Sequence, residues 1–381
     1  MQLGKTNWIC NHFLGAILGI FLYSSTAAQN NFIWSQDLDL PYQDENGKQF
    51  TGTEVIHLVP HKGKLYAGNS YWAENTDPRQ GQIWVKEGVN AAWKQDFEMP
   101  PLHSRVPSLY SFIFQKDYAG NNIAPDTILF AGATRDYGAE NDQGTATVFI
   151  RDDSQKQWIQ HDFPQVSDHE FGYTQVRSMG FHRDKLVGNQ GVDLVFAGAS
   201  LAPTGIYRGR YDPASPGKIR WDAQPEFTPS GFQRIMGFAV VNDTLYMATQ
   251  REIFKRIDGP NPGERWVQVL SLTDPDLVDQ YGQGLYDLWI QEEDIRGLRS
   301  IEDPFGEGEV LMFGGLNHLF RLDPKNNYQL TAEVDMEEVL ELATQHDFQY
   351  IQSQLIQDYT NPVTQEKVEG TMVRTRARLS G

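Results

Sequence analysis

The sequence predicts an all-β protein, a β-propeller with five recognisable four-stranded blades. Three observations carry this prediction. A pattern recurs five times at a spacing of roughly 60 residues, each copy holds four short alternating runs, and the order of aromatic and small residues is the same in every copy. Repetition of one four-stranded unit at this spacing is typical of propeller blades.

The blades follow in chain order, and polar or glycine-containing connections separate their runs. In the first blade the runs are residues 54–57, 65–68, 82–85 and 92–94. The same order of runs places the five blades at approximately 53–99, 105–162, 175–224, 232–270 and 294–332. Together they form one domain over residues 29–381.

The second run of each blade carries an aromatic residue close to small residues, as in Tyr66-Ala67-Gly68. A small residue here lets the neighbouring blade approach closely, and the large aromatic side chains fill the space between blades that splay from the axis. We therefore assign the recurring aromatic residues to packing between blades and not to a ligand site: Tyr66, Phe130, Phe196, Tyr246, Phe313, Trp93, Trp158, Trp221 and Trp266.

The chain after the fifth blade breaks this rhythm. Apolar residues from Asp335 onward have helical spacing, and we expect a C-terminal helical segment over residues 335–358. The last residues, 371–381, can supply one strand but not a further blade. Ring closure has three alternatives: five blades close alone, residues 32–35 and the C-terminal strand complete a sixth blade, or the chain stops short of a closing blade. We favour completion by both termini.

Residues 1–28 have the features of a secretory signal peptide, with Lys5, an apolar run at 13–23 and small residues at 24–28. The apolar run is too short to span a bilayer comfortably, and no other segment approaches the roughly 20 apolar residues of a spanning helix. We expect a monomer that is secreted or periplasmic, without a membrane span once the signal is removed. The single cysteine, Cys10, lies in the signal, so the mature chain would contain no disulfide.

The chain is acidic, with 50 Asp and Glu against 32 Lys and Arg and a net charge of −18. A field of this sign repels polyanions, which argues against nucleic acid and anionic membranes as partners.

Candidate site residues come from the first strand of each blade, because this strand lines the central channel of a propeller. Alignment at the strand start brings together Glu54, Ser108, Arg177, Arg234 and Arg296. The segments beginning at Arg177 and Arg234 agree at four of five places. We expect three guanidinium groups to converge near Glu54, with His57 on the same strand as Glu54.

Arginine suits the binding of carboxylate or phosphate because its planar group can donate two parallel hydrogen bonds. The cluster therefore predicts a binding site for a small anionic or polar organic ligand. The alternative is that each arginine pairs with an acidic side chain or a backbone carbonyl of the next blade and stabilises the fold.

Two histidines, His103 and His169, precede the first strands of the second and third blades, on connections that share one face of the disk. We take them as candidate general acid or base groups. No two histidines have a metal-ligand spacing such as His-x-x-x-His, and glycine motifs for phosphate or dinucleotide binding are absent from the sequence. We predict no metal and no cofactor.

Over roughly residues 50–332, the order of aromatic, small residue and tryptophan resembles secreted propeller repeats in general, loosely those of kelch-like and lactonase-like proteins. The double glycine of kelch-type repeats is found only at Gly314-Gly315. The carboxylate and asparagine set that binds metal in the lactonase-like group has no counterpart that we can place. The resemblance implies the fold and supplies no catalytic residue.

Three functions are compatible with this sequence. The first is binding of a small anionic or polar ligand in the central funnel, with lyase-type or hydrolase-type chemistry left open. The second is an extracellular module that binds a protein or glycan through its loops. The third is a metal-free cyclisation or isomerisation enzyme that shapes an apolar substrate in an aromatic funnel.

Overall fold

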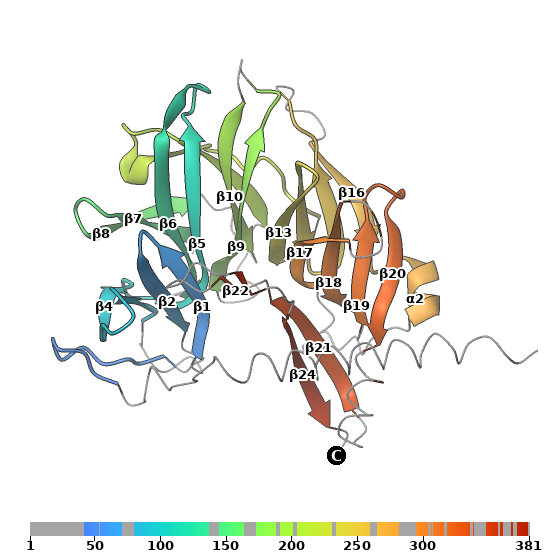
Figure 1. Cartoon of the computed structure of the whole chain (residues 1–381), viewed down its shortest axis with the longest axis horizontal. Helices are drawn as coiled ribbons and strands as arrows, with labels where there is room; N and C mark the ends of the chain where they lie inside the picture. Colours follow the sequence, from blue (N-terminus) through green and yellow to red (C-terminus); the bar gives the residue numbers. More distant parts are fainter. Residues whose placement is uncertain are drawn as a thin grey trace, which may run out of the picture. The chain divides into compact units, whose positions relative to one another are not determined.

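The chain forms an all-β structure in which five four-stranded antiparallel sheets follow one another along the sequence (Figure 1). This computed structural model describes residues 42–379, apart from 53, 71–79, 137–144, 164–172, 188–190, 201–203, 231–233, 260–264, 282–294, 304–305, 307, 316–317, 336–337, 339–347, 357–358, 361–366 and 369–371. The all-β prediction is confirmed. The predicted signal peptide, residues 1–28, lies outside the described residues.

The sheets pair each strand with the next one in the sequence. The first sheet consists of β1 (Glu54–His61), β2 (Lys64–Ser70), β3 (Gln82–Lys86) and β4 (Trp93–Glu98). The second consists of β5 (His103–Lys116), β6 (Asn122–Asp136), β7 (Ala146–Asp152) and β8 (Gln157–Phe163). The third consists of β9 (Tyr173–Asp184), β10 (Val192–Ser200), β11 (Gly205–Tyr211) and β12 (Ile219–Trp221), with a short 3-10 turn, η1 (Pro216–Lys218), before β12.

The last two sheets have the same order. The fourth consists of β13 (Ile235–Val241), β14 (Thr244–Thr249), β15 (Glu252–Arg256) and β16 (Trp266–Ser271). After the short helix α2 (Pro275–Tyr281), the fifth consists of β17 (Arg296–Glu302), β18 (Glu309–Gly315), β19 (His318–Asp323) and β20 (Gln329–Asp335).

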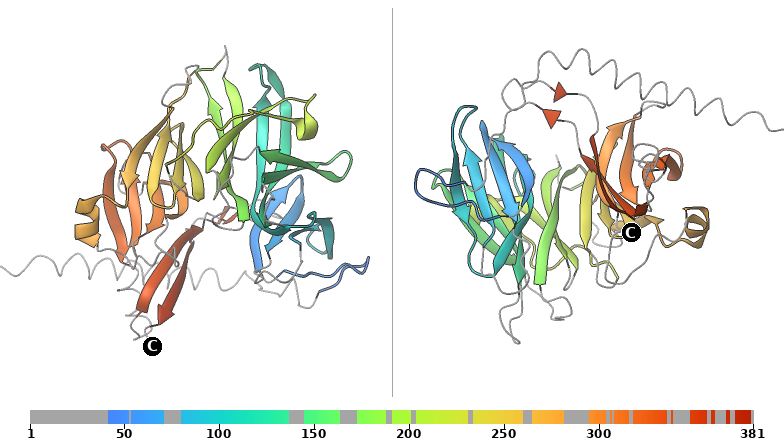
Figure 2. Two further views of the ribbon diagram at one scale, coloured as in Figure 1. Left: turned by 180° about the vertical axis from the view of Figure 1, so that it is seen from behind. Right: turned by 90° about the horizontal axis from the view of Figure 1, so that it is seen from below.

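The first strands of the five sheets are neighbours in chain order. Contacts join β1 to β5, β5 to β9, β9 to β13, and β13 to β17, and the two views of Figure 2 show the sheets following one another in this order. Short pairings between β2 and β5 and between β6 and β9 also link the first three sheets. Among the described residues β1 pairs only with β2, so no continuous closed ring of strands is formed there.

Glycines at the end of the second strands explain how closely neighbouring sheets pack. A Cβ atom added to Gly68 would lie 2.8 Å from Val106 Cγ1, and one added to Gly198 would lie 2.6 Å from Ile235 Cγ2. Gly132, the equivalent residue of the second sheet, likewise abuts the backbone of β9. Real Cβ atoms do not approach other atoms so closely, so only glycine fits. The expectation that small residues permit close approach of the next sheet is confirmed.

The recurring aromatic residues of the second strands form the core. Tyr66, Phe130, Phe196, Tyr246 and Phe313 are each buried. Phe130 belongs to an apolar cluster that contains residues of both the second and third sheets, as packing between sheets requires. The recurring tryptophans differ in burial, because Trp93 and Trp266 are buried whereas Trp158 and Trp221 are partly exposed.

The C-terminal region differs from expectation. Where a helical segment was expected over 335–358, residues Phe348–Ile356 form strand β21, which pairs antiparallel with β24 (Met372–Leu379). Backbone pairing with β24 outweighs the helical spacing of this segment. Its aromatic and β-branched residues also fit a strand. β21 contacts β17 and β18, and a two-residue pair, β22 (Tyr359–Thr360) with β23 (Lys367–Val368), lies between β21 and β24 in the sequence.

Candidate functional site

Each of the five first strands contributes partly exposed polar side chains to a set that we call the first-strand cluster. It consists of Glu54 and His57 on β1, Arg105 on β5, Tyr173 and Arg177 on β9, Arg234 directly before β13, and Arg299 on β17. The apolar residues beside them on four of these strands, including Val106, Val176 and Ile235, are fully buried. The strands therefore hold the polar side chains against a packed core, which limits how far they can move.

His57 is the histidine of this cluster, and its environment favours the neutral ring. Nε2 lies 2.8 Å from the carbonyl oxygen of Pro107, and the ring centroid lies 6.0 Å from that of Tyr110. Burial lowers the pKa of His57 to about 4, and the positive charges of Arg299 and Arg177 act in the same direction. A neutral ring that donates from Nε2 keeps a lone pair on Nδ1, which can accept a proton or a hydrogen bond.

A second group of residues is centred on Tyr173. Arg234 Nη2 donates a hydrogen bond of 2.9 Å to the Tyr173 hydroxyl, and Arg105 Cζ lies 6.0 Å from the centre of the same ring. Burial lowers the pKa of Arg105, and the charge of Arg234 adds to this, whereas Asp136, Tyr173 and Glu54 oppose it. Two guanidinium groups from different sheets thus share one tyrosine, and Glu54 acts on that of Arg105.

The register of the strands corrects the predicted alignment of the arginines. In β9 a bulge falls at Arg177, because Ser178 pairs with Gly198 and Val176 pairs with Ala199. In β13 the same bulge falls at Met236, because Gly237 pairs with Ala248 and Ile235 pairs with Thr249. Arg177 is therefore equivalent to Met236, whereas Arg234 lies two positions before Met236, directly ahead of β13. The repeated Met-Gly-Phe letters suggested a different alignment because bulges cannot be seen in a sequence.

Arg296 and Arg299 lie at opposite ends of the same bulge in β17. Arg296 is buried, with 7% of its surface exposed, and its Cα is paired with that of Gly314. Arg299, three residues later, is partly exposed and is the residue of this strand whose charge acts on His57. The structure therefore favours Arg299 over Arg296 as the contribution of β17.

The geometry of His103 favours a structural role over the predicted acid or base role. Nδ1 lies 3.2 Å from the carbonyl oxygens of both Pro100 and Pro101, and Nε2 lies 3.4 Å from Thr147 Oγ1. The ring packs edge-on against Phe149 and is 3% exposed. His103 therefore fixes the connection into β5. The second predicted histidine, His169, lies outside the described residues.

Sequence reasoning missed Arg105, Tyr173 and Arg299. Arg105 and Tyr173 precede the positions at which the repeats were aligned, so their presence beside the cluster depends on strand register. Arg299 is the fourth residue of the first run in the fifth blade, but the alignment at the strand start selected Arg296 instead. Aligning the first strands on the residue that pairs with the small residue of the second strand would have given the correct register.

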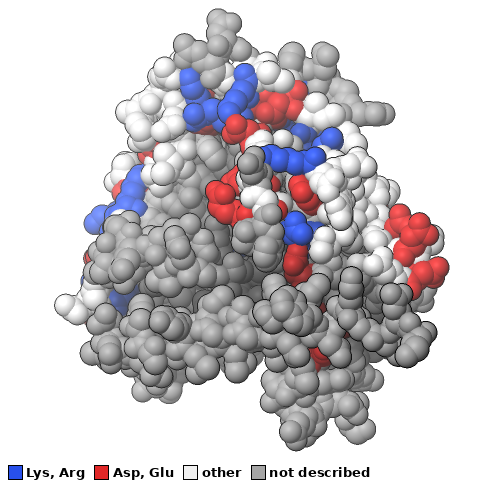
Figure 3. Space-filling view, turned by 45° about the vertical axis from the view of Figure 1, so that its right-hand side comes forward, with Lys and Arg blue, Asp and Glu red and all other residues white. Residues whose placement is uncertain are grey.

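The first-strand cluster is locally basic within an acidic chain. It contains four guanidinium groups and one carboxylate, whereas on the face shown in Figure 3 basic and acidic side chains lie interleaved. Within the described part of the chain, Arg234 Nε and Arg299 Nε are buried and have no hydrogen-bond partner. Buried donors of this kind favour a ligand that brings acceptors. Chemically, the cluster can bind an anion and can exchange a proton through His57 or Glu54.

Two further properties of the described residues bear on the class of protein. In the ranges given above, no helix is long and apolar enough to cross a bilayer. Within those same ranges, no three His, Cys, Asp or Glu side chains gather as a metal site would require.

Comparisons with known proteins do not assign a family. No protein-family model matches the chain, and no curated protein matches it significantly. Among solved structures, an exo-β-1,3-galactanase from Clostridium thermocellum is 10% identical with a TM-score of 0.35, covering 76% of this chain, which spans 63% of that protein. A putative exo-β-1,3-galactanase from Bifidobacterium bifidum is 10% identical with a TM-score of 0.32, covering 77% of this chain and 90% of the other.

A third structural neighbour is PorZ, a surface component of the type-IX secretion system of Porphyromonas gingivalis. It is 12% identical with a TM-score of 0.30, covering 78% of this chain and 43% of PorZ. TM-scores of this size do not establish a shared fold.

Proposed function

We propose that this chain is a secreted β-propeller that binds a small organic anion at the first-strand cluster. Secretion is supported by the signal-peptide features of residues 1–28. The propeller is supported by five four-stranded sheets in sequence order whose first strands are neighbours. In such a ring the first strands line the central channel, which makes the cluster a channel site.

The observation that carries the proposal is that four of the five first strands each bring one arginine to the same small region. Arg177 and Arg299 act on His57, and Arg105 and Arg234 meet at Tyr173. Glu54 lies in the field of Arg105 and is the carboxylate of the cluster. Guanidinium groups that already lower the pKa of neighbouring basic groups repel one another, and a bound anion relieves this repulsion.

Ring closure completes the channel in this proposal. Val55 pairs with Asn69 as Ile235 pairs with Thr249, yet Val55 is 40% exposed whereas Ile235 is fully buried. Leu58, on the same strand, is 58% exposed. These apolar side chains of β1 are the ones that a preceding blade would cover. We assign this cover to a closing blade to which the C-terminal strands contribute. Residues 32–35, which were expected to contribute as well, lie outside the described residues.

The ligand that best fits the cluster is a carboxylate or phosphate ester with polar substituents. Arginines contributed by different strands can contact separate oxygens of one anion, and neutral His57 offers either a donor or an acceptor to a hydroxyl. Chemistry on such a ligand would use His57 or Glu54 as the proton acceptor, and whether turnover occurs is decided by assay.

Thermal unfolding of the purified protein tests the proposal. The panel consists of organic acids, sugar acids, phosphorylated metabolites and neutral glycans, measured on the natural protein, Arg177→Ala, Arg234→Ala and the control Arg220→Ala. Arg220 is an exposed arginine of β12 that lies over the ring of Tyr118. An anion at 100 times its Kd is expected to add about 2.7 kcal/mol to the free energy of unfolding.

Loss of that stabilisation in Arg177→Ala and Arg234→Ala, but not in Arg220→Ala, supports a channel anion site. Stabilisation by glycans alone, unaffected by the two arginine variants, would instead support the glycan-binding module. The absence of any anion effect would make the arginines structural.

A further inference from the structure

A pocket of about 220 Å³ lies on the third sheet, away from the residues of the first-strand cluster. It is lined by Val187, Val192, Leu194, Arg208, Arg210 and Arg265. Val192 and Leu194 belong to β10, Arg208 and Arg210 to β11, and Arg265 directly precedes β16 of the fourth sheet. The lining therefore combines three apolar side chains, which we call the apolar wall, with three guanidinium groups.

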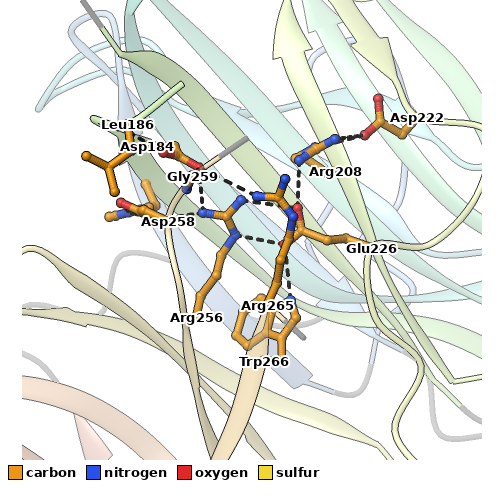
Figure 4. A network of polar contacts seen from close by, with 11 residues as sticks. Asp184, Leu186, Arg208, Asp222, Glu226, Arg256, Asp258, Gly259, Arg265 and Trp266 are labelled. Atoms are coloured by element: carbon orange, nitrogen blue, oxygen red, sulfur yellow. Dashed lines mark hydrogen bonds and ion pairs between the residues drawn. The ribbon is translucent and has the colours of Figure 1, made fainter. Parts of the chain in front are cut away.

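The carboxylates near this pocket are already engaged by a buried arginine (Figure 4). Arg256, whose side chain is 0% exposed, contacts Asp184 at 3.0 Å, Glu226 at 2.7 Å and Asp258 at 2.5 Å. Glu226 also accepts hydrogen bonds from Arg208 and from the indole of Trp266.

Asp184 likewise accepts the backbone N–H groups of Leu186 and Gly259. These acceptors thus have little capacity left for a further arginine.

Arg265 is the arginine that this network leaves incompletely satisfied. Only 8% of its side chain is exposed, and its Nη1 lies 3.8 Å from Asp184 Oδ2, too far for a hydrogen bond. Among the described residues, Arg265 Nη1 and Arg210 Nε are buried donors with no hydrogen-bond partner. Arg210 is held from its other side by Asp222, which also binds Arg208. Two residues that line one pocket therefore each carry a buried donor without an acceptor.

We propose that this pocket binds a small monocarboxylate with an apolar body. The carboxylate oxygens accept from Arg265 Nη1 and Arg210 Nε, and the hydrocarbon or aromatic part lies on Val192 and Leu194. A singly charged ligand fits better than a dianion because four carboxylates already match the four arginines of this network in number, so each further negative charge meets more repulsion. The carboxylates are Asp184, Asp222, Glu226 and Asp258, and the arginines are Arg208, Arg210, Arg256 and Arg265. The apolar wall excludes densely hydroxylated ligands, whose hydroxyl groups would be left without partners.

Fluorine NMR of fluorobenzoate with the purified protein tests this assignment, with fluorobenzyl alcohol as the neutral probe of the same shape. We expect saturable binding of fluorobenzoate, and affinity for the alcohol weaker by about tenfold or more, because hydrogen bonds to a charged acceptor are lost. Arg265→Met, which keeps the length of the side chain and removes its donors, is expected to weaken fluorobenzoate binding by about tenfold. Arg251→Met is the matched control and is expected to leave it unchanged, because Arg251 precedes β15 at the end of that strand opposite to Arg256 and Arg265.

Arg177→Ala separates this pocket from the first-strand cluster, because it should leave fluorobenzoate binding unchanged. Circular dichroism establishes that each variant is folded, and Arg210→Met replaces Arg265→Met if the latter is not. The assignment is overturned by the absence of saturable binding, by equal affinity for acid and alcohol, by full affinity in the folded arginine variant, or by loss of binding in Arg177→Ala.

Discussion

The guanidinium of Arg234 donates a hydrogen bond of 2.9 Å to the hydroxyl of Tyr173, so a side chain of the fourth sheet is fixed by one of the third. Arg105 of the second sheet lies over the same ring. Because these contacts join different sheets, the packing of the sheets determines where the charged groups of the first strands lie. The stability of the sheet packing and the geometry of the proposed anion site are therefore measurable through the same residues.

A double-mutant cycle with Arg234→Met and Tyr173→Phe should reveal this coupling. A hydrogen bond from a charged donor contributes about 1.5–3 kcal/mol, so a coupling free energy of about 1 kcal/mol or more is expected after partial solvent compensation. Urea unfolding of the four proteins measures it. Additive losses would show that the two side chains do not interact in solution.

Gly198→Ala tests the close approach of the third and fourth sheets. The added Cβ would lie 2.6 Å from Ile235 Cγ2, and the resulting overpacking should lower the free energy of unfolding by about 1–3 kcal/mol. Gly88→Ala is the matched control, because an added Cβ there meets no atom within 4 Å. Equal stability of the two variants in thermal unfolding would contradict the packing described here.

Arg256→Met should be among the most damaging single changes in the chain. It removes from Asp184, which is fully buried, the arginine that lies 3.0 Å from its carboxylate, and removal of one member of a buried pair costs about 3–5 kcal/mol. Lys185→Met is the contrasting change, because Lys185 and Asp243 form an exposed pair whose loss should cost less than about 1 kcal/mol. A loss below about 1 kcal/mol for Arg256→Met would mean that water reaches Asp184.

His57 should make stability fall as the pH is lowered. Its pKa is about 4 in the folded protein against an ordinary 6.5, so between these values the unfolded chain binds the proton more readily than the folded one. The contribution is complete above pH 6.5 and is lost as the pH falls towards 4, with a size on the order of 2–3 kcal/mol. His57→Gln should flatten the slope of unfolding free energy against pH in that window. An unchanged slope would show that His57 titrates normally.

Anion binding should raise the pKa of His57, because a bound anion offsets the charges of Arg177 and Arg299. NMR titration of the His57 ring, with and without a stabilising anion, measures this shift. A constant or lowered pKa would place the anion elsewhere.

The exposed face of β1 provides the test of ring closure. If a closing blade covers Val55, then Val55→Asp buries a charge and should cost at least about 2 kcal/mol. Val89→Asp is the control, because Val89 is 58% exposed in the β3–β4 turn. Equal, small effects of the two changes on thermal unfolding would indicate that β1 is an open edge.

The strands were predictable because their signals are local. Alternation within each run, and the need for glycine at positions such as Gly198, are properties of single strands and their immediate neighbours. The segment at Phe348–Ile356 was not predictable from its own spacing, because its partner strand lies more than ten residues further along the chain and supplies the hydrogen bonds.

The residues that gather in the first-strand cluster were predicted only in part, and their role in binding stays a prediction. Glu54, His57, Arg177 and Arg234 were named from the repeat and lie in the first-strand cluster. Arg299 and Arg105 were missed because one bulged residue changes which positions are equivalent between sheets. The roles of the named residues depend on side-chain partners from other sheets, which no single repeat encodes.

Calorimetric titration with the most strongly stabilising anion of the panel is the most direct test of the central claim. The account predicts that Arg177→Ala and Arg234→Ala each weaken the Kd by about tenfold or more, because each removes a charged donor, and that Arg220→Ala leaves it unchanged. Equal affinities in all four proteins would contradict an anion site built from the first strands.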